Sequence, residues 1–500
     1  MRSHQLLRFG MSAFLFSAVT WGFAARATVA APADTASDIG KIPITTKSDE
    51  ARKEYLLGRD LFERLLAQES LQHFDKAIAL DPDFAFAELA RANSAPTAKE
   101  FFEHQKNAIT LADQASEGER LFILANEAGA NGKPVDQKQY LDKLLAAFPN
   151  DERVQFNLAG YYFGQQDYSE AIAHYKKATE ISPNYSPAYN LLGYAYRQQG
   201  NYSAAEQAFK KYVELIPNDP NPYDSYAELL LKMGKFDDSI ARYRKALSID
   251  PHFANSHFGI AAGLMYLGKT EAAEKELQTM ADQARNDGER RTALFGSTVV
   301  AVDSGKLSKG LEAMDKQYAI AEKKNDAAAM AGDLQAKGNI LLEMNRYDTA
   351  AQQFDRAFQI MQASNLSQQI KDNARLLHTF NTAALAIARK ELGAAKKSAQ
   401  EFSSGAEALK NPAQLRQAHE LAGRIALAEN DYSKAIAELE QANQQDPRNL
   451  YRLSRAYQAN GDAAKAQEFG KKAAEFNSLP ALNYAFIRSK ARTMAASKKL

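Results

Sequence analysis

Two consecutive stretches of 34 residues contain the pattern that decides the fold: ERVQFNLAGYYFGQQDYSEAIAHYKKATEISPNY at residues 152–185 and SPAYNLLGYAYRQQGNYSAAEQAFKKYVELIPND at residues 186–219. Small and apolar residues recur at the same slots in both stretches. The slots hold Leu158, Ala159, Tyr162, Ala171, Tyr175 and Ala178 in the first stretch and Leu192, Gly193, Tyr196, Ala205, Phe209 and Tyr212 in the second. Each trio has helical spacing, so each stretch predicts two amphipathic helices joined by a tight turn.

Four prolines mark the period of this pattern, because Pro149, Pro183, Pro217 and Pro251 follow one another at intervals of 34 residues. Proline lacks an amide donor and disfavours helical geometry in the residue before it, so each position predicts the end of a second helix. A single helix pair cannot bury its own apolar stripe. The repeats must therefore stack on one another to form a core.

The sequence pattern is a large residue, then Leu-Gly or Leu-Ala, Tyr, Ala, Phe or Tyr, Ala and a closing Pro, and it resembles the tetratricopeptide repeat family. Clear matches cover residues 51–84, 152–287, 334–361 and 416–447. Weaker matches cover residues 119–151, 292–324, 376–407 and 450–479. The resemblance implies an all-α fold, namely a right-handed α-solenoid of stacked antiparallel helix pairs.

Composition and repeat quality divide the chain into segments. We predict a signal peptide at 1–30, a flexible linker at 31–50, an N-terminal repeat array at 51–287, irregular helical repeats at 288–412, C-terminal repeats at 413–480, and a capping helix with a basic tail at 481–500. The irregular part has lost most closing prolines, so longer helix pairs are expected there. The tail supplies the polar outer face that the last unit of a solenoid needs.

The first thirty residues differ from the rest of the chain. Arg2 and Arg8 flank a polar start, residues 9–24 are mostly apolar, and small residues before Ala30 offer a cleavage site. We therefore predict export to the periplasm or secretion. The alternative is an uncleaved segment that anchors the protein. No later stretch is apolar enough to span a bilayer, so no spanning segment is expected after signal removal.

Charge and cysteine content restrict the function. The chain has 62 Lys and Arg against 61 Asp and Glu, a net charge of +1, so no overall field draws it to nucleic acid, and we expect no nucleic-acid partner. Cysteine is absent, which excludes disulfides, thiolate metal sites and a cysteine nucleophile.

Two motifs suggest chemistry and are better explained by the repeats. Residues 263–270, GLMYLGKT, fit the phosphate-binding consensus, but they continue a helix and place Gly268 where other repeats have their turn. His419 and Glu420 begin like a zinc-peptidase helix, but Gly423 stands where the second histidine is needed. We therefore expect no catalytic residues, no metal ligands and no cofactor.

In tetratricopeptide proteins the first helix of each pair lines a concave groove. Carried over to this chain, the resemblance implies a binding groove made of Phe156, Asn190, Tyr194, Arg197, Asn221, Asp224, Glu228, Asn255, Phe258 and Met265. These aromatic, amide and charged side chains suit an extended peptide or a partner helix. The acidic Asp224 and Glu228 favour a basic or neutral ligand. The alternative is that these residues do not bind a ligand and only form a hydrated surface that keeps the protein soluble.

These observations favour a non-enzymatic scaffold that binds a protein or peptide in the bacterial envelope or the secreted space. One alternative is a structural or assembly subunit of an envelope export or polysaccharide machinery. Another is an enzyme or nucleotide-dependent regulator, which the motifs support least.

Overall fold

The computed structural model describes residues 40–496, and every regular element within this range is a helix. The prediction of an all-α fold is therefore confirmed. The signal peptide predicted at residues 1–30 lies outside the described residues. Between residues 40 and 496, none of the helices combines the length and the apolar character that crossing a membrane requires.

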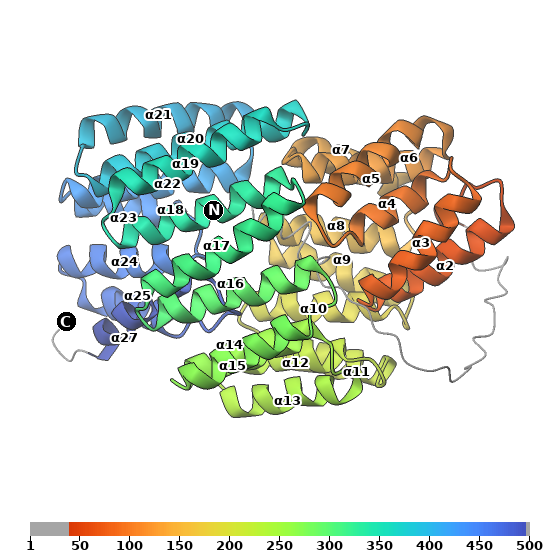
Figure 1. Cartoon of the computed structure of the whole chain (residues 1–500), viewed down its shortest axis with the longest axis horizontal. Helices are drawn as coiled ribbons and strands as arrows, with labels where there is room; N and C mark the ends of the chain where they lie inside the picture. The colour runs from red at the N-terminus through yellow and green to blue at the C-terminus, as the bar shows by residue number, and fades with distance from the viewer. Residues whose placement is uncertain (1–39, 497–500) are drawn as a thin grey trace.

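The helices follow one another as pairs of packed neighbours (Figure 1). The first seven pairs are α2 (Asp49–Glu63) with α3 (Ala67–Leu80), α4 (Ala85–Asn93) with α5 (Ala98–Leu111), α6 (Glu117–Ala130) with α7 (Pro134–Ala147), α8 (Glu152–Gln165) with α9 (Tyr168–Ile181), α10 (Ser186–Gln198) with α11 (Tyr202–Leu215), α12 (Asn221–Lys232) with α13 (Phe236–Ile249), and α14 (Ala254–Tyr266) with α15 (Thr270–Asp282). A short 3₁₀ helix at Ala112–Gln114 follows α5.

The helices become longer in the second half of the chain. The later elements are α16 (Asp287–Asp303) with α17 (Leu307–Lys323), α18 (Ala327–Glu343) with α19 (Tyr347–Ala363), α20 (Gln368–Ala388) with α21 (Leu392–Leu409), α22 (Pro412–Ala428) with α23 (Tyr432–Gln441), α24 (Pro447–Ala459) with α25 (Ala463–Ala474), and then α26 (Leu482–Ala485) and α27 (Arg488–Ala496). Helices α16 to α22 have 17 to 21 residues, whereas α8 to α15 have 12 to 14.

The turn inside a pair requires a residue in the left-handed conformation. Gly200, Gly234 and Gly268 occupy this place with φ of 80°, 75° and 75°, and Gln166 does so with φ of 67°. Glycine suits the position because it has no Cβ to clash with the carbonyl that follows. The side chain of Asn201 then accepts a hydrogen bond from the first turn of α11, which satisfies one of the amides left free there.

Small residues allow the two helices of a pair to approach closely. A Cβ added to Gly193 would lie 2.7 Å from the ring of Phe209, and one added to Gly338 would lie 2.3 Å from the ring of Phe354. The aromatic rings fill the space that the missing side chains leave, so these glycines are required by packing rather than by backbone conformation.

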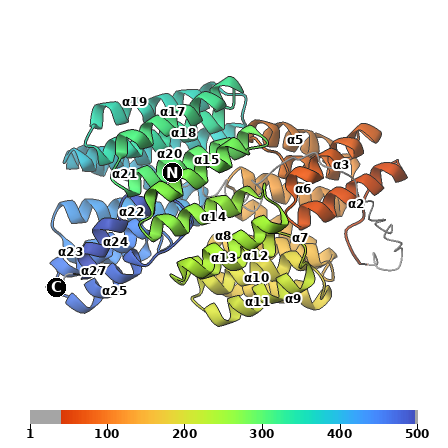
Figure 2. The ribbon, with the colours of Figure 1, turned by 60° about the horizontal axis from the view of Figure 1, so that its bottom comes forward.

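The solenoid winds far enough for one superhelical turn to pack on the next. Polar contacts between the turns join residues 218, 236 and 244 positions apart, namely Gln68 with Asn286, Asn131 with Ser367, and Lys232 with the carbonyl of Phe476. One turn therefore takes about seven repeats of the tetratricopeptide length. Figures 1 and 2 show α2 and α27 at opposite sides of the molecule, with α16 to α18 between them.

The segment predicted as a flexible linker at residues 31–50 is not a free spacer where the structure describes it. The backbone amide of Ile42 donates to Asp151 at 2.9 Å, and that of Thr45 donates to Glu119 at 2.8 Å. These carboxylates belong to different repeats, so this segment is docked along the array. Its small polar residues gave no sign of that contact.

The C-terminal end also differs from the capping helix predicted at residues 481–500. Leu482 and Tyr484 are buried, with exposed fractions of 3% and 1%, in a core that they share with α12, α14 and α16. Arg488 then forms two hydrogen bonds with Asp303, one of them 2.6 Å long. Helix α27 packs on α25, the last helix of the last pair, as a cap does, and this end also joins the two superhelical turns.

Candidate functional site

The concave face of the superhelix contains a cavity of about 1180 Å³. Most of its wall comes from the first helices of successive pairs, from α2 through α8, α10 and α12 to α18. Residues 41–44 and residues 479–483 add to the wall from the two ends of the described chain. The groove is therefore shaped by both superhelical turns.

Nine of the ten residues predicted for the groove line this cavity, namely Phe156, Asn190, Tyr194, Arg197, Asn221, Asp224, Glu228, Asn255 and Phe258. Met265 does not. It is 3% exposed and packs in the core that contains Leu482 and Tyr484. The prediction for Met265 is wrong because the second superhelical turn covers this part of the first. The repeat pattern predicts contacts within the first turn and does not predict that the second turn packs on it.

A charged and aromatic network stands at the centre of the cavity wall. The hydroxyl of Tyr194 donates to Glu228 Oε2 at 2.8 Å, and Arg197 Nη1 donates to Glu228 Oε1 at 2.5 Å. The guanidinium of Arg197 also lies 4.6 Å from the centre of the Tyr194 ring. Burial by itself lowers the pKa of Arg197, but the Glu228 carboxylate outweighs it and raises that pKa above its ordinary value. The three side chains hold one another in fixed positions.

A second polar layer lies beneath this network. Asn221 Oδ1 accepts hydrogen bonds from Tyr212 at 2.9 Å and from Ser225 at 3.2 Å. Ser256 donates to Asp224 Oδ1 at 2.7 Å. Asn221 and Asp224 are both buried, so their hydrogen-bonding atoms serve the contacts between α10, α12 and α14.

The burial of Asp224 changes its expected role. Removal from water raises the pKa of this carboxyl to about 8, because the charged form loses its hydration. The side chain is therefore mainly neutral at pH 7, and the negative charge of Glu228 is already paired with Arg197. The expectation that Asp224 and Glu228 favour a basic ligand at this place does not hold.

Replacing Asp224 by asparagine is expected to stabilise the protein at high pH. The pKa of Asp224 in the folded protein, about 8, lies above its ordinary value of 3.8. The contribution of Asp224 to the free energy of unfolding is therefore fully present below about pH 4, and it is lost as the pH rises through 8. In urea unfolding at about pH 9 the variant should exceed the wild type by at least about 1 kcal/mol. At about pH 5 the two should differ much less, and equal differences at both pH values would contradict the assignment.

Helix α8 has a notch in its cavity-facing surface at Gly160. A Cβ at this exposed residue would meet only the hydroxyl of Tyr175, at 3.9 Å. That hydroxyl is buried and has no hydrogen-bond partner among the described residues, and the same is true of Asn190 Oδ1 and Arg197 Nε. All these residues line the cavity. Phe156, one turn before Gly160, packs edge-on against the Tyr175 ring with the ring centres 5.6 Å apart.

Other cavity residues come from repeats where the sequence gave no groove prediction. Arg291 on α16 donates to Asp333 on α18 at 2.7 Å and 3.0 Å, and Gln317 on α17 donates to the same carboxylate at 2.6 Å. These helices lie in the part of the chain with the weakest repeat signature. Only the packing of the second turn brings them to the cavity.

The motifs that suggested chemistry are structural in this fold. Gly263 lies inside α14, and a Cβ there would be 2.8 Å from Ile240, so this glycine is needed for close helix packing. Gly423 is similar, because its Cβ would lie 2.6 Å from Leu439. The neighbouring His419 bonds to Glu438 at 2.8 Å. Among residues 40–496 there is no group of three or more His, Asp or Glu side chains that could hold a metal ion.

Two models of the tetratricopeptide repeat match this sequence, one at residues 162–229 and again at 230–294, the other at residues 124–186. The matched residues are those in which paired helices with close Gly or Ala contacts build the cavity wall. Residues 124–294 of the chain are tetratricopeptide repeats. No curated protein matches the sequence significantly.

Solved structures of other tetratricopeptide proteins resemble parts of this chain. A crystal structure of MamA is 22% identical and covers 33% of this chain and 91% of its own, with a TM-score of 0.28. YrrB, described as having an unusual peptide-binding site, is 19% identical and covers 36% and 91%, with a TM-score of 0.25. A tetratricopeptide repeat protein from Parabacteroides merdae is 15% identical and covers 52% and 98%, with a TM-score of 0.36.

Proposed function

We propose that this tetratricopeptide protein is a non-enzymatic scaffold that holds a protein or peptide partner in its concave groove, within the bacterial envelope or the secreted space. The contact surface is the groove strip, which we define as Phe156, Gly160, Asn190, Tyr194 and Arg197. It lies on α8 and α10, and all five residues line the cavity.

The unpartnered polar atoms of the groove strip carry this proposal. Among residues 40–496, Asn190 Oδ1 has no donor and Arg197 Nε has no acceptor, although both atoms are buried among residues that line the cavity. Buried polar groups are nearly always hydrogen-bonded, so a ligand that brings both kinds of partner gains from this surface. A peptide backbone does so, because N–H and C=O groups alternate along it. The ring of Phe156 and the notch at Gly160 provide an apolar contact beside them.

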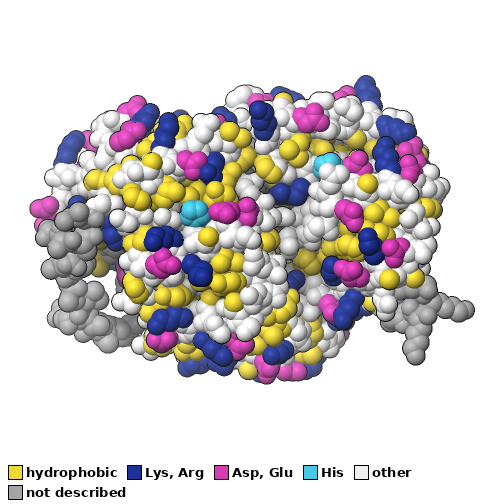
Figure 3. All heavy atoms as spheres, turned by 180° about the vertical axis from the view of Figure 1, so that it is seen from behind, with side chains coloured by type: hydrophobic (Ala, Val, Ile, Leu, Met, Phe, Trp, Pro, Cys, Tyr) yellow, Lys and Arg dark blue, Asp and Glu magenta, His cyan; other side chains and the backbone are white. Residues whose placement is uncertain are grey.

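The charge distribution on the outer surface favours recognition of the partner by the groove and not by the overall charge of the protein. On the face seen in Figure 3, acidic and basic side chains are interspersed, and neither sign covers a large area. Many charged side chains of the described residues form local ion pairs, such as Lys138 with Asp142 and Lys472 with Glu468. A partner is therefore selected by the shape and hydrogen bonds of the groove strip.

The proposed location rests on the first thirty residues, which have the basic start, apolar centre and small-residue end of a signal peptide. The absence of cysteine is compatible with an oxidising compartment. Mass spectrometry of the protein recovered from the envelope or the medium should give a chain that lacks about its first thirty residues.

A cysteine at Gly160 is expected to capture the partner. The chain has no cysteine of its own, so a benzophenone maleimide attached to Gly160→Cys projects a single photo-crosslinker into the cavity. The notch leaves room for the new side chain, because its Cβ would meet only the Tyr175 hydroxyl at 3.9 Å. Irradiation with envelope extract should give one dominant crosslinked species, which mass spectrometry identifies.

Gly164→Cys is the matched control. Gly164 lies one turn further along α8, has no atom within 4 Å of an added Cβ, and does not line the cavity. The labelled control should give no such species, and adding Arg197→Ala to the Gly160→Cys protein should reduce its yield several-fold. Equal capture from both positions would refute the proposal.

A further inference from the structure

Residues 40–47, which we call the arm, lie extended along the start of the array. Half-buried and exposed side chains alternate along the arm, with Ile42, Ile44 and Thr46 half-buried and Pro43, Thr45 and Lys47 exposed. This is the period of an extended chain on a surface. None of the arm residues is fully buried, whereas the core residues of the repeats beneath are less than 9% exposed.

The repeats hold the arm by its backbone as well as by the side chains of Ile42 and Ile44, which pack against the cores of the first repeats. Three amide groups of the arm donate to three carboxylates, Ile42 to Asp151 at 2.9 Å, Thr45 to Glu119 at 2.8 Å and Lys47 to Asp81 at 2.9 Å. The three carboxylates come from three different helix pairs, so they form a ladder along the array. Any extended segment that lies in the same direction can donate its backbone amides to these three carboxylates.

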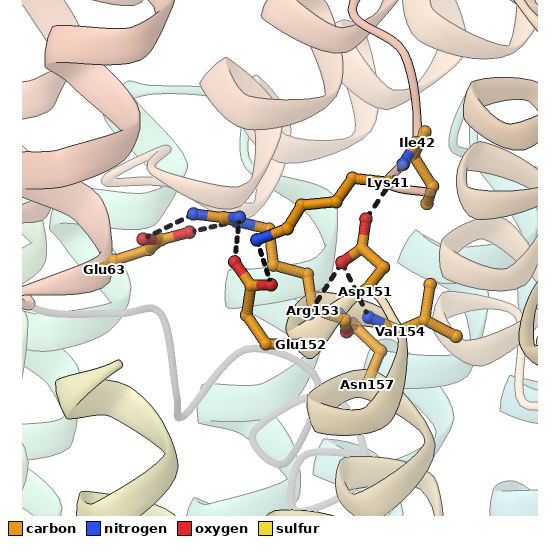
Figure 4. A network of polar contacts seen from close by, with 8 residues as sticks. All are labelled: Lys41, Ile42, Glu63, Asp151, Glu152, Arg153, Val154 and Asn157. Carbon is orange, nitrogen blue, oxygen red and sulfur yellow. Dashed lines mark hydrogen bonds and ion pairs between the residues drawn. The ribbon is translucent and has the colours of Figure 1, made fainter. Parts of the chain in front are cut away.

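Two lysines of the arm add charge to this recognition. Lys41 Nζ lies 2.6 Å from Glu152, and Lys47 Nζ lies 2.6 Å from Asp83. Figure 4 shows Lys41 reaching from the arm to Glu152, which Arg153 contacts from the other side. Burial by itself raises the pKa of Glu152, but Arg153 and Lys41 outweigh it and hold that pKa below its ordinary value. Glu152 is therefore charged and buried, and it requires a cation beside it.

The arm also occupies part of the groove wall. Lys41 to Ile44 line the same cavity as Phe156 and Gly160. The arm lies at the N-terminal end of α8, and Gly160 lies eight positions beyond Glu152 on this helix, a rise of about 12 Å. A peptide that extends from the groove strip to the start of α8 therefore meets the arm.

We propose that the arm is a displaceable internal ligand, and that a partner peptide with two basic side chains about six positions apart replaces it on the ladder of Asp81, Glu119 and Asp151 and beside Glu152 and Asp83. This inference rests on the proposed function, since it names the chemistry and the regulation of the same groove. The arm protects the ladder and closes one end of the cavity when no partner is bound. The partner repeats its contacts, two lysine or arginine pairs and three backbone amides, and continues into the groove strip.

The first experiment releases the arm in the full chain. In the Lys41→Glu/Thr45→Pro variant, a negative charge faces Glu152 and the amide that Glu119 accepts is absent. Hydrogen exchange followed by mass spectrometry should show the backbone amides of the arm exchanging at least tenfold faster than in the wild type. Lys53→Glu is the matched control, because this exposed lysine on α2 undergoes the same charge change away from the ladder.

The second experiment supplies the arm as a separate peptide. Fluorescein-labelled GKIPITTKS, the sequence of residues 40–48, should bind the released variant at least tenfold more tightly than the wild type or Lys53→Glu. A peptide with the same composition in scrambled order should bind weakly. Affinity should fall as salt is raised, because the lysine pairs lie at a half-exposed surface.

Two results would overturn this proposal. One is an arm that keeps its protection in the variant while circular dichroism shows that the repeats remain folded, since the arm is then not displaceable. The other is a released variant that fails to bind the peptide. Neither result depends on a cellular partner. If Gly160→Cys captures no partner, the proposed function fails, but the peptide measurement still tests the arm. If the peptide experiment fails, the proposal for the arm fails, but the proposed function of the groove strip does not.

Discussion

Gly259→Ala is expected to lower the free energy of unfolding by about 3 kcal/mol. A Cβ at this position in α14 would lie 2.1 Å, 2.4 Å and 2.5 Å from three ring atoms of Tyr243. Tyr243 is 1% exposed and is held between α12 and α14, so its ring has no space into which it can move. The helices must separate to accept the methyl group, and the neighbouring contacts are then lost.

The control for this experiment is Gly164→Ala in α8. Nothing lies within 4 Å of a Cβ at Gly164, and the residue is inside a helix, so alanine should stabilise the protein by about 0.5 to 1 kcal/mol through its higher helix propensity. Urea unfolding followed by circular dichroism gives both values. If Gly259→Ala were neutral or stabilising as well, the close contact between α14 and the Tyr243 ring would be incorrect.

Arg488→Ala is expected to cost about 3 kcal/mol and to loosen the C-terminal end of the array from α16. Arg488 is the double hydrogen-bond partner of Asp303, whose side chain is 6% exposed, and its guanidinium lies 5.3 Å from the centre of the Tyr266 ring. Removal of the arginine leaves a buried carboxylate without its partner, which is more costly than the loss of the attraction alone. The loss should appear in urea unfolding as a lower midpoint.

Lys490→Ala serves as the comparison, because Lys490 lies on the same helix and also pairs with a carboxylate of a distant helix, Glu343 on α18. Its side chain is 55% exposed and its partner Glu343 is 33% exposed, so water screens the pair, and the change should stay within about 0.5 kcal/mol. If both substitutions lowered the free energy of unfolding equally, the loss would come from removing a positive charge from α27 and not from breaking a buried ion pair. X-ray scattering should show a larger radius of gyration for Arg488→Ala alone.

The regular repeats made much of the groove predictable. Phe156, Asn190 and Asp224 stand at equivalent positions in three consecutive repeats, and the structure places all of them on the cavity wall. The repeat pattern predicts these positions because every helix of the array makes the same contacts with its neighbours. Side chains at equivalent positions of successive repeats therefore point to the same face. Its chemistry was less predictable. Asp224 has a pKa of about 8 because the surrounding helices remove it from water, although the hydrogen bond from Ser256 acts in the opposite direction, and the slot alone does not reveal that burial.

The contacts of the arm had no signal in the sequence. Lys41 and Glu152 are 111 positions apart, and Thr45 and Glu119 are 74 positions apart. Residues 31–50 are rich in small polar residues and proline, which is also the composition of a free spacer. Glu119, Asp151 and Glu152 lie at helix starts, where acidic residues are common because they cap the helix, as Asp151 does for α8. Asp81 follows the end of α3.

By itself the sequence determined the local architecture of this protein, because its apolar spacing, turn residues and closing prolines act within one repeat or between neighbouring repeats. It fixed paired helices, all-α stacking and the inner slots from Phe156 to Phe258. Only the tertiary structure decided which inner residues stay accessible. That choice depends on contacts between superhelical turns more than 200 residues apart, such as Lys232 with Phe476, which bury Met265, whereas the groove strip lines the cavity. No repeat carries a pattern for contacts of that range, because they arise from the accumulated curvature of about seven repeats.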